Sequence, residues 1–70
     1  MTEIRAEMVA NVWKVVATEG DEVHDGDTLV ILESMKMEIP VLAEGDGVLA
    51  SLAVAEGDVI QEGDLIAVIE

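Results

Sequence analysis

The chain contains two lysines, and the sequence around them differs in what it predicts. Lys14 lies inside the apolar pattern of residues 12–16, where a charged residue marks the solvent face of a strand. Lys36 instead stands between Met35 and Met37, near the middle of the chain. A lysine amine becomes a nucleophile once it loses its proton. The pattern therefore indicates that the chain displays Lys36 for covalent chemistry.

Other residue types that carry chemistry lack the partners they need. His24 is the only histidine and there is no cysteine, so a zinc site is not expected. A calcium loop starting at Asp21 would require oxygen ligands where Val23 and Leu32 stand. Ser34 has no histidine or other base near it in the sequence. We expect neither a metal site nor a catalytic residue.

An internal repeat surrounds Lys36. Gly20 and Gly26 recur as Gly57 and Gly63, in each case 37 residues later, and residues 6–33 match residues 43–70 without a gap. Residues 34–42 are left as the connection between the two halves. Lys36 therefore occupies the joint of a two-fold repeat.

The elements that must position this joint are strands. Hydrophobic residues make up 51% of the chain and are almost all aliphatic, with Trp13 as the only aromatic residue. Branched aliphatic residues favour a pleated, half-buried surface. Trp13 is expected to fill the core or to cap one sheet. Strands are predicted at residues 4–8, 11–17, 28–33, 38–43, 47–54 and 65–70, and short extended pieces at Val23 and at Val59–Ile60.

This pattern predicts an all-β fold with pseudo-two-fold symmetry. We expect a flattened barrel or sandwich of two antiparallel sheets, each with three or four strands. The connection at residues 34–42 should form an exposed hairpin at one end, and both termini should lie at the opposite end. His24 is aligned with Gln61 by the repeat, which predicts an exposed polar turn position for it.

Length and charge limit the function classes. Seventy residues allow one domain, residues 1–70. The formal net charge of −13 argues against nucleic acid as a partner and favours a soluble monomer. No basic segment leads into an apolar run, and no apolar run is long enough to cross a membrane. We therefore expect a cytoplasmic protein without a membrane partner.

The motif around Lys36 resembles the attachment motif of biotinyl domains. Residues 33–37 read Glu-Ser-Met-Lys-Met, and the family usually has Glu-Ala-Met-Lys-Met. The glycine and aspartate turns of both halves resemble the paired turns of the family, as does the Asp46–Leu49 segment. The resemblance covers nearly the whole chain and is greatest to stand-alone bacterial biotin/lipoyl attachment proteins. It implies a barrel-sandwich hybrid, and the gapless repeat predicts that the protruding thumb of some carriers is absent.

One segment departs from the family. Many members have Ala-Pro-Met-Pro-Gly near the N-terminus, whereas residues 6–10 here read Ala-Glu-Met-Val-Ala. Asn11 is the candidate to adopt the positive φ that the missing glycine would supply, because Asn tolerates that conformation better than most residues. The departure bears on partner recognition more than on the fold.

The resemblance implies a role for each residue near Lys36. A biotin protein ligase activates biotin as an acyl-adenylate, and Lys36 attacks it to form an amide. Met35 and Met37 then contact the arm or, alternatively, fill the small core. Glu33, Ser34 and Glu38 help the ligase recognise the hairpin, although Glu33 and Glu38 are equally explained as solvated charges.

The implied function is a non-catalytic carrier that moves carboxylate between a biotin carboxylase and a carboxyltransferase. Two alternatives remain open with the same fold. In the first, Lys36 accepts lipoate, alone or in addition to biotin, although the lipoyl motif is typically Asp-Lys-Ala. In the second, the chain is an unmodified interaction module.

Overall fold

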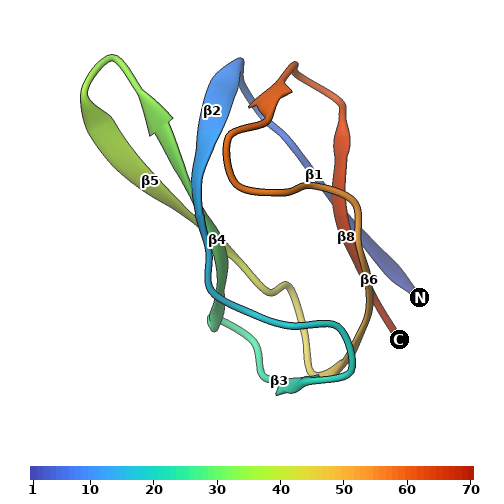
Figure 1. Ribbon diagram of the computed structural model, residues 1–70. Helices are drawn as coiled ribbons and strands as arrows, with labels where there is room; N and C mark the ends of the chain where they lie inside the picture. The colour runs from blue at the N-terminus through green and yellow to red at the C-terminus, as the bar shows by residue number, and fades with distance from the viewer.

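The computed structural model describes residues 1–70, which form eight β-strands and no helix (Figure 1). The strands are β1 (Thr2–Arg5), β2 (Ala10–Val15), β3 (Glu22–Val23), β4 (Thr28–Ser34), β5 (Met37–Leu42), β6 (Gly47–Leu52), β7 (Val59–Ile60) and β8 (Leu65–Ile69). They build two four-stranded antiparallel sheets, with strand orders β1-β8-β6-β3 and β5-β4-β2-β7. No helix is present that could cross a membrane. The all-β, two-sheet prediction is confirmed.

The internal repeat is also a repeat of the topology. A shift of 37 residues carries β1 onto β5, β2 onto β6, β3 onto β7 and β4 onto β8, and it converts one sheet order into the other. Single hydrogen bonds repeat as well. Gly20 N donates to Leu49 O, and Gly57 N donates to Val12 O, both at 2.8 Å. The repeat therefore extends past residue 6 into β1, further than the sequence match indicated.

Strand boundaries agree with the prediction to within two residues except at the N-terminus. The first strand was expected at residues 4–8, but β1 ends at Arg5 and Glu7 and Met8 form a bend. β1 is held by β8, with Thr2 opposite Ile69 and Ile4 opposite Ala67. Its position is thus set by a strand more than sixty residues away. The short extended pieces at Val23 and Val59–Ile60 form β3 and β7.

The core between the sheets is aliphatic throughout. All fifteen buried residues are Ala, Val, Leu or Ile, and the largest fully buried side chains are Leu29, Leu49, Ile66, Val12 and Val30. Of the two positions expected for Trp13, the core position is wrong, because this side chain is 47% exposed. Side chains alternate along β2, so Val12 points inward and Trp13 points outward. The register with β4 also shifts here, at a bulge between Val12 and Lys14.

Aspartate side chains close the four glycine turns. The carboxylate of Asp21 accepts from Thr18 N, that of Asp27 from His24 N, and their repeat counterparts do the same. The glycines that precede these aspartates have φ between +91° and +95°. Eight of the sixteen acidic side chains accept a backbone N–H in this structure. Half of the acidic side chains thus serve to satisfy backbone N–H groups.

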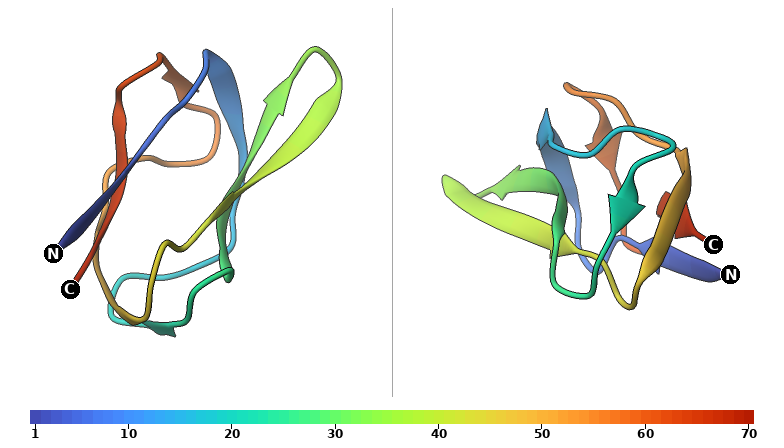
Figure 2. Two further views of the ribbon diagram at one scale, coloured as in Figure 1. Left: turned by 180° about the vertical axis from the view of Figure 1, so that it is seen from behind. Right: turned by 90° about the horizontal axis from the view of Figure 1, so that it is seen from below.

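The hairpin of β4 and β5 lies at one end of the molecule, and both termini lie at the other (Figures 1 and 2). The views from the front, the back and below agree on this separation. The expected arrangement, with the mid-chain connection remote from the chain ends, is confirmed. β8 and β1 pair as β4 and β5 do, but no turn joins them, because the chain ends there.

Candidate functional site

The β4–β5 hairpin holds Lys36 at its tip. Register is continuous up to the turn, with Leu32 opposite Ile39, Glu33 opposite Glu38 and Ser34 opposite Met37. Only Met35 and Lys36 remain between the strands. A two-residue loop leaves little freedom to the backbone, so the position of Lys36 follows from the pairing of the two strands.

Both turn residues have positive φ, +52° at Met35 and +65° at Lys36. Positive φ at both central positions defines a type I′ turn, for which Asn-Gly is the preferred sequence. Here the two residues carry side chains, and left-handed backbone costs such residues roughly 1–2 kcal/mol each. Residues held in this conformation cluster at functional sites.

Sequence reasoning missed this conformation and assigned it elsewhere. Asn11 was expected to have positive φ, but Met35 and Lys36 are the only residues other than glycine that do. Asn11 instead lies in β2, paired with Glu33 and Val59. Strand pairing on both sides requires extended backbone there. No sequence signal located the strained turn, because the predicted strands at residues 28–33 and 38–43 left four residues between them, and only the observed pairing reduces the loop to two.

The amine of Lys36 is free. Its side chain is exposed, and it makes no hydrogen bond and no ion pair. Met35 is 92% exposed and Met37 is 64% exposed, so neither fills the core. The alternative interpretation of the methionines as core residues is therefore wrong. Lys14 is exposed too, in β2, so exposure alone does not distinguish the lysines. The backbone conformation and the position at a tip do.

Two carboxylates stand next to the turn. Glu33 and Glu38 are direct cross-strand partners on one face of the hairpin. Like charges directly opposite each other are destabilising in an antiparallel pair. Neither side chain has an ion-pair partner. Ser34 is half-buried beneath the turn. The structure thus brings all the residues predicted around Lys36 into one hairpin end.

The structure contains no other group of side chains arranged as a candidate functional site. His24 is exposed at a turn, as expected, with Nε2 3.5 Å from Glu22 and Nδ1 3.9 Å from Asp46. No group of three or more His, Cys, Asp or Glu side chains is placed to hold a metal ion. The arrangement at the hairpin can do one kind of chemistry, which is to present a primary amine to an acylating partner.

Comparison with known proteins supplies matches over nearly the whole chain. A family model described as "Biotin-requiring enzyme" matches residues 2–69. A relative from Mycobacterium leprae, "Biotinylated protein TB7.3 homolog", is 61% identical over 67 residues, covering 96% of this chain and 94% of the relative. The "Biotin/lipoyl attachment protein" of Bacillus subtilis is 41% identical over 63 residues, which are 90% of this chain and 86% of that protein.

A solved structure shares the fold. In the urea carboxylase of Kluyveromyces lactis, a segment superposes on this chain with a TM-score of 0.93 at 38% identity. The match covers 99% of this chain and 6% of the carboxylase. A unit of this size thus occurs both as a separate protein and as a small part of a large one.

Proposed function

The chain belongs to the biotin/lipoyl attachment family, and we propose that it is a biotin carboxyl carrier modified at Lys36. The observation that carries the proposal is a single unpaired lysine amine at the apex of a two-residue turn, with positive φ at Met35 and Lys36. A turn with side chains in this conformation is costly, and the cost falls at the one place where an amine has to project.

The residues present fit a covalently attached biotin. Lys36 would hold biotin through its Nζ, which, once deprotonated, would attack the activated carboxyl carbon, so that an amide bond would form as the bond to the activating group breaks. Nothing has to be broken first, because the amine has no partner in the structure. The exposed side chains of Met35 and Met37 offer flexible apolar contact to the start of the arm.

Once attached, biotin supplies a ureido group that takes up and gives up carboxylate. The chain supplies position and reach, and we propose that it catalyses nothing by itself. Its partners would be a biotin protein ligase, a biotin carboxylase and a carboxyltransferase, acting in the cytoplasm on a monomeric carrier. Tethering the headgroup to a small protein raises its effective concentration at each active site.

The sequence next to Lys36 favours biotin over lipoate. Met35 stands where lipoyl domains typically carry an acidic residue, and the relative from Mycobacterium leprae is named for biotin alone. The Bacillus subtilis relative is named for both groups, so the family as a whole includes lipoate as well as biotin. An unmodified interaction module would give no reason for the strained lysine turn.

Intact mass spectrometry of the protein from its native cells tests the proposal. We expect a species heavier by one biotinyl group, and a peptide map that places the group on Lys36. Incubated with biotin ligase, ATP and biotin, the Lys36→Arg variant should give no streptavidin signal. Lys14→Arg, the matched control, should be labelled like the wild type. A signal that persists on Lys36→Arg would overturn the site.

A further inference from the structure

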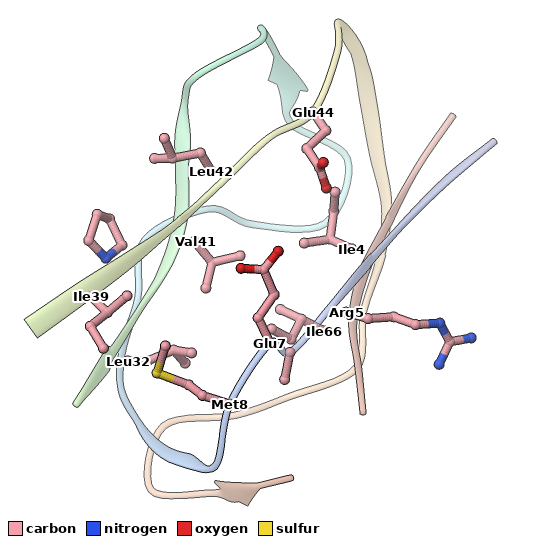
Figure 3. A pocket seen from close by; sticks show the side chains of 12 residues that line it. Ile4, Arg5, Glu7, Met8, Leu32, Ile39, Val41, Leu42, Glu44 and Ile66 are labelled. Carbon is pink, nitrogen blue, oxygen red and sulfur yellow. The ribbon is translucent and has the colours of Figure 1, made fainter. Parts of the chain in front are cut away.

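A groove lies between two edge strands, one from each sheet. It has a volume of about 220 Å³ and runs between β1 and β5, the outer strands of the two sheets (Figure 3). Met8, Leu32 and Ile39 lie together at one end of it. An apolar cavity of about 150 Å³ is large enough to bind benzene. The groove is therefore large enough for a small bicyclic group.

Two carboxylates point into the same groove. Glu7 and Glu44 are counterparts in the repeat, and Figure 3 shows both side chains directed into the space beside Ile4 and Val41. Neither carboxylate has a hydrogen bond or an ion pair. Other carboxylates, such as Glu33 and Glu38, are also free of such partners, so this pair is distinguished by its place in the lining of the groove. The carboxylates of Glu7 and Glu44 would suit a ligand with N–H donors.

The apolar end of the groove is the end nearer Lys36. Leu32 and Ile39 pair with each other, and Ile39 is three residues from Lys36 along β5. At the rise of a strand this separation is roughly 10 Å. A lysine side chain joined to the valeryl chain of biotin reaches roughly 14 Å when extended, from ordinary bond lengths. The headgroup of an arm on Lys36 can therefore fold back to the groove.

We propose that this groove is a resting site for the bicyclic headgroup of biotin carried on Lys36 of the same chain. The inference rests on the proposed function. The thioether ring and the valeryl chain would lie against Met8, Leu32 and Ile39. The ureido N–H groups would donate to the carboxylates of Glu7 and Glu44. The dithiolane ring of lipoate has no N–H donor and would not satisfy these acceptors.

The test compares the protein before and after biotinylation by methyl NMR. Intact mass first establishes that Lys36 carries biotin, and failure at this step would count against the proposed function only. On the biotinylated protein we expect shifts of the Met8, Leu32 and Ile39 methyl signals, and nuclear Overhauser effects from the biotin ring to the Met8 methyl. Val59, exposed in β7, is the internal control and should not move.

Two sets of variants sharpen the result. Unmodified Lys36→Gln removes the lysine charge without adding a headgroup, so its groove signals should match those of the unmodified wild type. The double variant Glu7→Gln and Glu44→Gln, once biotinylated, should show smaller groove shifts than the biotinylated wild type, because a neutral amide oxygen accepts a weaker hydrogen bond than a carboxylate and the bound population falls. Glu62→Gln removes one carboxylate charge outside the groove and should leave the shifts intact.

The proposal would be overturned by shifts that stay within residues 33–38 on a protein proven to carry biotin. It would also be overturned if Lys36→Gln alone reproduced the groove shifts. Undiminished shifts in the biotinylated double Glu→Gln variant would remove the two carboxylates from the site.

Discussion

The turns at the glycines and the turn at Lys36 meet the same backbone requirement with different residues. At Gly20, Gly26, Gly57 and Gly63 positive φ falls on a residue without a Cβ. An aspartate one position later closes each of these turns. At the hairpin tip positive φ falls on Met35 and Lys36, and no side chain closes the turn. The fold uses low-cost turns where only chain reversal is needed, and a strained one where an amine projects.

Symmetry explains where that difference arises. Every turn within a half has a counterpart in the other half, but the β4–β5 turn has none, because its counterpart would join the two chain termini. The residues at the hairpin tip are thus not part of the repeat that places glycine and aspartate at the other turns. The following variants change the position of the lysine, the residue next to it, and the backbone strain at a glycine turn and at the tip.

The largest effect expected is on the rate of biotinylation when the lysine is moved by one residue. Exchanging Lys36 and Met37 keeps the composition but places the lysine on β5, outside the left-handed position. A displacement of this kind can cost a factor of about a hundred in rate, so biotinylation by the ligase should fall roughly a hundredfold. The measurement is a streptavidin time course, with circular dichroism to verify the fold. Equal rates for both proteins would show that local sequence, not geometry, is recognised.

Changing the neighbour of the lysine should alter the choice of cofactor. Met35→Asp introduces the acidic residue typical of lipoyl domains while Lys36 keeps its place. A change of one contact is worth a few kcal/mol at most, so the ratio of biotinyl to lipoyl product should fall about tenfold. Parallel mass spectrometry after incubation with each ligase gives the ratio. A ratio equal to that of the wild type would mean that Met35 does not discriminate.

A glycine turn should be less tolerant of a side chain than its open surroundings indicate. No atom lies within 4 Å of a Cβ built on Gly63, yet its φ is +91°. Gly63→Ala should lower the free energy of unfolding by about 1–2 kcal/mol from backbone strain alone. Urea titration measures the loss, with Glu62→Ala as a control in the same turn. An unchanged midpoint would refute the strain argument.

Relieving the strain at the tip should have the smallest effect, with the opposite sign. Asn is better suited than Met to the first central position of a type I′ turn. Met35→Asn should therefore raise the free energy of unfolding by about 0.5–1 kcal/mol, while Lys36 remains the acceptor. A thermal melt and the streptavidin assay give the two results. A less stable variant would show that the Met35 side chain contributes contacts that outweigh its strained backbone.

The repeat made most of the fold predictable from the sequence. Two matched halves of alternating aliphatic residues, separated by glycine and aspartate turns, are enough to predict two similar sheets. The same match left residues 34–42 as the joint, which predicts a hairpin carrying Lys36. These predictions succeed because they depend on local residue patterns and on the internal repeat, and both can be read directly from the sequence.

Tertiary structure alone decided which residues carry strain and which lie close together. Asn11 has an ordinary strand conformation because it pairs with β4 on one side and with β7 on the other. Trp13 is exposed because its neighbour in β2, Val12, is the residue that points into the core. Gly47 has no room for a Cβ, which would lie 2.5 Å from the carbonyl oxygen of Glu70.

The groove that brings Glu7 and Glu44 together exists only because β1 and β5 become the outer strands of facing sheets. By itself the sequence determined the strands, the repeat and the place of the lysine. The φ angles of Met35 and Lys36 and the set of side chains that line the groove come from pairing between segments far apart in the chain, which a linear pattern does not encode.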